Sequence, residues 1–205
     1  KTVTIANPLG EDFSIMRTVS LNGVLTSLAT NYNRKNKIAR LYEFGNVYLP
    51  KSLPLTELPE ERMKLTIGMY GQGDFFDLKG VLEELTDKVG LKGKVTYEPE
   101  AEYTFLHPGR QAKLKKGNLT IGFIGQVHPE VCDNYNLKGE VYVAVIDMPT
   151  LVMLSSFDIK YEGIAKFPGS TRDLSLVVDK EIFVGQIEEV IKKCGGKLLE
   201  SYKLF

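Results

Sequence analysis

The most informative part of this chain is a set of three runs: Phe75-Phe76-Asp77-Leu78-Lys79-Gly80, Phe105-Leu106-His107-Pro108-Gly109-Arg110 and Ile124-Gly125-Gln126-Val127-His128-Pro129-Glu130-Val131. In the first run, Asp77 is of a residue type that caps helices, and it predicts a helix that ends near Val89. In the other two runs, His107 and His128 each precede a proline, which favours extended or turn backbone. The runs therefore mark places where strands give way to turns or helices.

On either side of these runs, hydrophobic spacing and turn residues predict an antiparallel sheet with a few helices. The predicted helices cover 21–33, 77–89, 129–134 and 149–154, and the predicted strands cover 38–49, 64–70, 95–98, 103–106, 111–115, 119–127 and 141–146. Residues 50–61 are predicted to form a surface loop, and Lys116-Gly117-Asn118 a hairpin turn. This pattern indicates an α+β layer architecture over residues 1–154.

The rest of the chain has a different organisation. Residues 155–162 are predicted to be a connector, and 163–205 a β-α-β unit with strands over 174–178 and 198–205 and a helix over 184–193 that Gly195-Gly196 ends. Such a unit buries little by itself, so a partner half is expected. Both chain ends have the character of strands, and we expect the sequence to be a piece of a longer protein.

Composition restricts the function classes. The chain has 26 Lys+Arg and 26 Asp+Glu, whereas a dedicated nucleic-acid binder usually carries a basic excess. No run reaches the ~18 to 20 apolar residues of a membrane helix, and the first residues lack the pattern of a signal peptide. Cys132 and Cys194 lack metal-ligand spacing and are expected to be buried, reduced thiols of a cytoplasmic protein.

The helix predicted over 21–33 carries two stripes. The apolar stripe consists of Leu21, Val24, Leu25, Leu28, Ala29 and Tyr32, and the small, weakly polar stripe consists of Gly23, Thr26, Ser27 and Thr30. Burying an apolar side chain stabilises a fold by roughly 1.5 to 3 kcal/mol. We therefore expect the apolar stripe to face its own sheet and the small stripe to meet another protein surface.

Several further motifs appear in a fixed order along almost the whole chain. They are Asn7-Pro8-Leu9, Met16-Arg17-Thr18, Asn31-Tyr32-Asn33-Arg34-Lys35, Leu41-Tyr42-Glu43-Phe44-Gly45, the three runs above, Lys166-Phe167-Pro168 and Arg172-Asp173-Leu174-Ser175-Leu176-Val177-Val178. In this order the set resembles the C-terminal part of the beta subunit of bacterial phenylalanyl-tRNA synthetase.

The resemblance implies a fold and a role. Residues 1–154 would be a non-catalytic relative of the class II synthetase catalytic module, and 163–205 the first half of a ferredoxin-like anticodon-binding domain. The helix from Leu21 would correspond to the dimer-forming first motif, with its small stripe against the alpha subunit, and the strand through Leu41 and Phe44 to the second motif. The full enzyme would be a cytoplasmic alpha2beta2 assembly that uses ATP and magnesium to join phenylalanine to tRNA. Catalysis would belong to alpha, with no catalytic residue, metal or cofactor in this chain.

Departures from the alpha subunit's pattern support that division of labour. In an ungapped comparison, Val145 and Asp147 replace two glycines, Thr150 replaces an arginine that contacts ATP, and His107 replaces a glutamate. A triphosphate needs a cation and a close backbone approach, and a carboxylate beside it adds repulsion. We therefore predict that this chain has no ATP site, which disfavours the alternative of an active class II ligase.

The basic residues are ambiguous. Lys166, Arg172 and Lys180 are the best candidates for contact with tRNA, although an ion pair between Arg172 and Asp173 is the preferred interpretation of that pair. A second basic group lies at a helix end and consists of Arg34, Lys35 and Lys37 beside Tyr32. Favourable interaction of these cations with the helix dipole explains their position better than contact with RNA does. A stand-alone RNA-binding or regulatory protein built from the same modules is the remaining alternative, disfavoured by the neutral charge.

Two other patterns are weak. His107 and His128 could share a metal ion, but such sites normally have four ligands, and no cysteine or acidic residue stands at ligand spacing from them. Turn roles are therefore preferred for both histidines. Gly68, Gly71 and Gly73 lack the lysine of a phosphate-binding Walker motif and are predicted to serve a strand end and its turn.

Overall fold

The computed structural model describes residues 2–91, 95–100, 102–158, 161 and 168–205. The chain divides into two compact units, Lys1–Ile159 and Lys160–Phe205.

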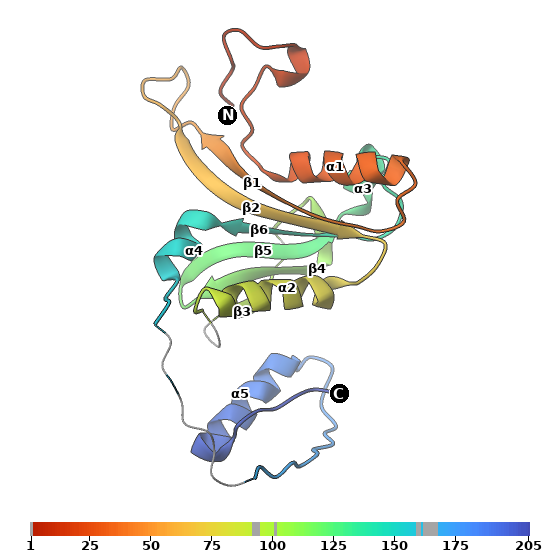
Figure 1. Cartoon of the computed structure of the whole chain (residues 1–205), viewed down its shortest axis with the longest axis vertical. Coiled ribbons are helices and arrows are strands. Elements are labelled where there is room, and N and C mark those ends of the chain that lie inside the picture. The colour runs from red at the N-terminus through yellow and green to blue at the C-terminus, as the bar shows by residue number, and fades with distance from the viewer. Residues whose placement is uncertain (1, 92–94, 101, 159–160, 162–167) are drawn as a thin grey trace. The chain divides into compact units, whose positions relative to one another are not determined.

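The first unit is built on a six-stranded antiparallel sheet (Figure 1) with the strand order β1-β2-β6-β5-β4-β3. The strands are β1 (Ala39–Leu49), β2 (Glu60–Tyr70), β3 (Thr96–Pro99), β4 (Leu106–Lys116), β5 (Leu119–Val127) and β6 (Val141–Asp147). Gly117, with φ of 59°, sits in the predicted hairpin turn between β4 and β5. The sheet leaves β1 as one edge strand.

Helices cover both faces of this sheet. On one face lie α1 (Leu21–Asn33), which packs on β1 and β2, and the short α3 (Pro129–Asn134); on the other lie α2 (Phe75–Lys88) and α4 (Met148–Leu154). β6 is buried along its whole length because it serves both layers. Val143 packs into the core under α1, and its neighbour Ala144 into the core under α2, as the two-residue period of a strand requires.

The apolar stripe of α1 faces its own sheet, as predicted. Leu21, Val24, Leu25, Leu28 and Ala29 are all buried. The helix approaches β2 closely at Gly68, where a Cβ atom would lie 2.6 Å from Val24 Cγ1 and 2.9 Å from Leu28 Cδ1. Gly68 is therefore required by packing, and the prediction that it serves a strand end and turn is corrected: it lies within β2.

Several element boundaries also differ from those predicted. Asp74, and not Asp77, caps α2: its carboxylate accepts from the backbone N–H groups of Phe76 and Asp77, and the Asp77 side chain accepts from the Asp74 N–H. β2 begins at Glu60, because its first residues pair with the end of β1. The strands predicted over 103–106 and 111–115 are replaced by one strand, β4, with an irregularity in register between Leu106 and Gln111.

The second unit contains α5 (Val184–Gly195) and a 3-10 turn, η2 (Gly196–Leu198). Gly196 follows α5 with φ of 55°, which confirms the predicted glycine end. The strands predicted over 174–178 and 198–205 are wrong, since the described part of this unit has no strand. The physical reason is that an extended segment becomes a strand only when its backbone groups pair with another segment.

The two cysteines lie in different environments. Cys132 is buried as predicted, and burial raises the pKa of its thiol to about 11, but Cys194 is exposed, which corrects that prediction. Among the described helices, none combines the length and apolar character needed to span a membrane.

Candidate functional site

Two of the residues that the resemblance compares with ATP-binding groups, Asp147 and Thr150, lie in a partly buried ionic cluster at the junction of β6 and α4. Asp147 caps α4, and its carboxylate accepts from the Thr150 backbone N–H at 3.1 Å and from the Thr150 hydroxyl at 2.5 Å. Arg62 on β2 binds the same carboxylate through two nitrogens, at 2.5 Å and 2.8 Å, and Lys64 donates at 2.7 Å. The antiparallel register, which places Lys64 opposite Asp147, brings these groups together.

The charges of this cluster satisfy one another. Burial by itself raises the pKa of Asp147, but hydrogen bonds from Arg62, Lys64 and Thr150 outweigh burial and hold that pKa well below its usual range. The hydrogen bond to Asp147, followed by one to Glu60, raises the pKa of Arg62 further. The carboxylate is thus ionised and occupied by two cations, which supports a structural role for the cluster.

Sequence reasoning missed Arg62 and Lys64. The signal available was their alternation on one strand, which places two cations on the same face. Their partner could not be identified because it is 85 residues away from Arg62 in the sequence.

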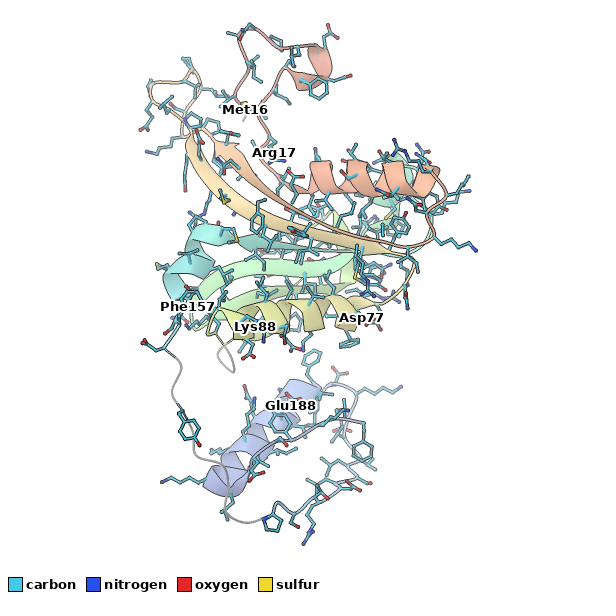
Figure 2. The ribbon with its side chains drawn as sticks, viewed as in Figure 1. Met16, Arg17, Asp77, Lys88, Phe157 and Glu188 are labelled. Carbon is cyan, nitrogen blue, oxygen red and sulfur yellow. The ribbon has the colours of Figure 1, made fainter. Side chains whose placement is uncertain are left out.

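A shallow apolar groove of about 450 Å³ lies where α2 leaves the outer strands of the sheet uncovered. Its walls include Tyr42 and Phe44 of β1, Leu65 and Ile67 of β2, and Val81 and Leu85 of α2. Figure 2 labels Asp77 and Lys88 at the two ends of the helix that forms one wall. Arg40 is the only charged residue among the lining side chains. The groove is therefore suited to an apolar group and unsuited to a magnesium triphosphate, which needs several cations and carboxylates.

The small stripe of α1 is largely exposed. Thr26, Ser27 and Thr30 face solvent, and the Thr30 hydroxyl donates to the Thr26 carbonyl at 2.9 Å. Gly23 differs from the other three because it lies against β1: a Cβ atom there would be 2.5 Å from Glu43 Oε2. The stripe therefore offers a surface of three short polar side chains.

The candidate RNA-binding residues fall in the second unit. Arg172 and Lys180 are exposed, and Lys166 lies outside the described residues. The Arg172 guanidinium donates to the Ser170 hydroxyl at 2.7 Å and to the Thr171 carbonyl at 2.8 Å. Its predicted ion pair with Asp173 is absent from the described contacts; local acceptors take its place.

The second basic group lies just beyond the end of α1. Arg34, Lys35 and Lys37 are exposed, and Lys35 has a positive φ of 67°. Tyr32 packs edge-on against Tyr70 at a centroid distance of 5.7 Å. Its ring therefore serves internal packing, and base stacking on it has no support.

The two histidines have local backbone roles: His128 caps α3 as a turn residue, whereas His107 lies within β4, so its predicted turn role is wrong. Nδ1 of His107 accepts from the Gly109 N–H, and Nδ1 of His128 accepts from the Glu130 N–H at the start of α3. No group of three or more metal-ligating side chains occurs among the described residues.

Comparison with known proteins places this architecture in a family. Residues 1–148 match the family model described as "Phenylalanyl tRNA synthetase beta chain CLM domain". The chain belongs to this family. Residues 165–205 match a second model, "Ferredoxin-fold anticodon binding domain", so the two predicted modules follow each other in the predicted order.

Relatives of this synthetase beta chain family cover the whole sequence. The chain is 48% identical over 203 residues to the phenylalanine–tRNA ligase beta subunit of Clostridium acetobutylicum, and 44% identical over 204 residues to that of Clostridium tetani. These matches include 99% and 100% of this chain but only 25% and 26% of the relatives. The chain thus spans about a quarter of the length of these relatives.

A solved structure confirms the class II synthetase-like α+β fold. The crystal structure of pyrrolysyl-tRNA synthetase from Desulfitobacterium hafniense superposes with a TM-score of 0.59 at 13% sequence identity. The match covers 75% of this chain and 52% of that structure. At this identity the similarity concerns the fold alone.

Proposed function

We propose that this chain is a part of the beta subunit of a phenylalanine–tRNA ligase, the enzyme that attaches phenylalanine to its tRNA. The similarity to the Clostridium acetobutylicum beta subunit along 99% of the chain carries this proposal. The arrangement of both family models along the same sequence supports it and disfavours a stand-alone RNA-binding protein.

In this proposal the chemistry resides in an alpha subunit, which would bind ATP and magnesium. Two observations support the division: Asp147 is occupied by Arg62 and Lys64, and the groove on the sheet is apolar. The residues present do not fit a triphosphate, so no catalytic step is assigned to them. Their role is to provide a stable folded module for assembly.

Calorimetric titration with ATP and magnesium tests this division. We expect no saturable heat with the isolated chain. The Asp147→Gly variant should also fail to bind, because removal of the carboxylate exposes cations but creates no adenosine pocket. Saturable binding of ATP to the native chain at micromolar concentration would overturn the division.

We further propose that the assembly contains two alpha and two beta subunits and acts in the cytoplasm, and that this chain meets alpha through Thr26, Ser27 and Thr30 of the small stripe of α1; Gly23, the fourth residue of the predicted stripe, lies against β1 instead. Native mass spectrometry of the co-expressed subunits tests the stoichiometry, with a mass equal to two copies of each subunit as the expected result. A one-to-one complex at all concentrations would contradict it.

The second unit would contribute to tRNA binding on the anticodon side, through Lys166, Arg172 and Lys180. Its match to the anticodon-binding family and the exposure of Arg172 and Lys180 support this role. A gel-shift experiment with the cognate tRNA separates this role from that of a stand-alone RNA-binding protein. Weak binding by the chain alone is expected, whereas strong, salt-sensitive binding would favour the stand-alone protein.

A further inference from the structure

The open edge of β1 is a place where another polypeptide can bind. In an antiparallel ladder, alternate residues direct their backbone N–H and C=O groups to the same neighbour. The Tyr48 N–H donates to the Arg17 carbonyl at 2.9 Å, and the Asn46 carbonyl accepts from Arg17 Nε at 2.8 Å. The backbone N–H and C=O groups of the even-numbered residues of β1 therefore point away from β2. Figure 2 shows Arg17 beside this end of the strand.

The N-terminal segment therefore pairs with only the last part of the edge. By the same alternation, the backbone groups of Arg40, Tyr42 and Phe44 face outward, and the described residues offer them no backbone partner. A five-residue stretch of edge is thus ready to pair with an added strand.

The side chains of the same residues form the rim of the apolar groove. Tyr42 is 71% exposed and Phe44 is 54% exposed, and their rings contact each other edge-on at a centroid distance of 6.0 Å. Across the groove, Val81 of α2 is also exposed. A strand added to β1 would place every second side chain on this apolar surface, so the occupant must be apolar at alternate positions.

Two exposed cations at the start of β1 indicate the charge expected at one end of an added strand. Arg40 and Lys37 are exposed at the start of β1, and neither forms an ion pair with any other described residue. The Arg40 guanidinium has only a long contact, 3.5 Å, with the Gln72 carbonyl. An acidic residue of the occupant beside Arg40 would complement these cations.

We propose that the free edge of β1 from Arg40 to Phe44 and the adjoining groove dock an extended segment of the alpha subunit by strand addition. The segment is apolar at alternate positions and carries a carboxylate at its Arg40 end. This inference rests on the proposed function, because that proposal supplies alpha as the partner. It places a second contact on the face of the sheet opposite α1.

Affinity for alpha tests the proposal. The chain and the variants Tyr42→Asp, Phe44→Asp and Arg40→Glu would be titrated with purified alpha subunit, with Phe13→Asp as the matched control because Phe13 is 69% exposed but lies outside β1. We expect each β1 variant to weaken binding at least tenfold and the control to leave it unchanged. Circular dichroism and thermal unfolding verify that each variant is folded.

Hydrogen exchange followed by NMR provides a readout that does not depend on the variants. Binding of alpha should slow exchange at the amides of Arg40, Tyr42 and Phe44, while Leu41 and Glu43, whose N–H groups face β2, should be protected already in the free chain. Unchanged exchange at the three outward amides in the complex would overturn strand addition.

The outcomes separate this inference from the proposed function. Failure of the native chain to bind alpha would overturn both. Binding of alpha that all three β1 variants retain would overturn only the docking site. If sedimentation shows instead that the chain self-associates through β1, and Tyr42→Asp abolishes that association while binding to alpha persists, the occupant is a second copy and the proposal is wrong.

Discussion

The Asp147 carboxylate accepts from both Nε and Nη2 of Arg62, at 2.5 Å and 2.8 Å, and so joins β2 to the junction of β6 and α4. The Asp147 side chain is 9% exposed and the Arg62 side chain is 37% exposed. Because one partner remains partly solvated, the pair contributes less than a fully buried ion pair would. Its contribution is nevertheless measurable, because removal of the carboxylate leaves Arg62 and Lys64 without their shared partner.

We predict that Asp147→Asn lowers the free energy of unfolding by about 2 kcal/mol at pH 7, less than the ~3 to 5 kcal/mol for breaking a fully buried pair. Urea denaturation measures this change. Glu60→Gln is the matched control, because it removes the other, half-exposed carboxylate that contacts Arg62. The control variant should lower the free energy of unfolding by less than about 0.5 kcal/mol, because surface ion pairs contribute little. Equal losses in the two variants would show that burial of the pair has no special effect.

The same group makes a defined contribution to the pH dependence of stability. An aspartate titrates near pH 4 when unfolded, about its ordinary pKa, and the folded pKa of Asp147 is depressed. The unfolded state therefore binds the proton more tightly. The contribution is present above about pH 4 and is lost as the pH falls further. In urea unfolding measured between about pH 2 and pH 7, the Asp147→Asn variant should lack this part of the acid destabilisation; an unchanged profile would contradict it.

Close packing at Gly68 gives a second prediction. Gly68→Val should destabilise the first unit by about 1 to 3 kcal/mol, because the new atoms overlap Val24 and Leu28 and force α1 away from β2. Gly80→Ala is the control: no atom lies within 4 Å of a Cβ atom there, and the residue is inside α2. This variant should be more stable by up to about 1 kcal/mol, since alanine favours helices. Both changes are measured by urea unfolding, and a neutral Gly68→Val would contradict the packing.

The cap of α2 provides a third prediction. Asp74→Ala should lower the free energy of unfolding by about 1 kcal/mol, because two backbone N–H groups lose their acceptor. Asp77→Ala removes an acceptor from one N–H group only and should cost less. Thermal unfolding of the two variants compares them. A larger loss at position 77 would support the cap that the sequence alone predicted.

The outcome at α1 and α2 shows what a sequence can specify. The limits of α1 were predicted to the residue, because its apolar stripe begins at Leu21 and local spacing determines it. The N-cap of α2 was misplaced by three residues, because Asp74 and Asp77 have equally suitable side chains and form a reciprocal capping box. Choosing between them requires the backbone conformation.

Contacts between distant segments were beyond the sequence. The partners Arg62 and Asp147 meet only because β2 and β6 are neighbours, although β3, β4 and β5 separate them along the chain. The strands predicted over 174–178 and 198–205 failed for a related reason: apolar alternation indicates extended backbone, but only a pairing partner makes a strand. The exposure of Tyr42 and Phe44 likewise depends on how much of the sheet α2 covers.

A fourth prediction concerns the small stripe of α1. Ser27→Leu should weaken association with the alpha subunit at least tenfold, or by about 1.4 kcal/mol, because a bulky side chain would separate the two surfaces. Ser27 is exposed, so the folded chain should keep its stability. Thr120→Leu, at an exposed position of β5, is the control for added apolar surface. Titration with purified alpha measures both, and full affinity in Ser27→Leu would remove this surface from the interface.

The fifth prediction concerns the second unit and tRNA. If Arg172 and Lys180 contact phosphates, Arg172→Ala and Lys180→Ala should each weaken binding of the cognate tRNA and reduce the slope of log affinity against log salt by about 1. Lys166→Ala should behave in the same way. The hydrogen bonds to Ser170 and Thr171 hold the Arg172 guanidinium in place, so Arg172→Lys should recover the charge but only part of the affinity. Fluorescence anisotropy at several salt concentrations measures the slope, with Lys88→Ala on α2 as the control. If the slope for Arg172→Ala equals that of the control, Arg172 does not contact a phosphate, and its contacts with Ser170 and Thr171 are its whole role.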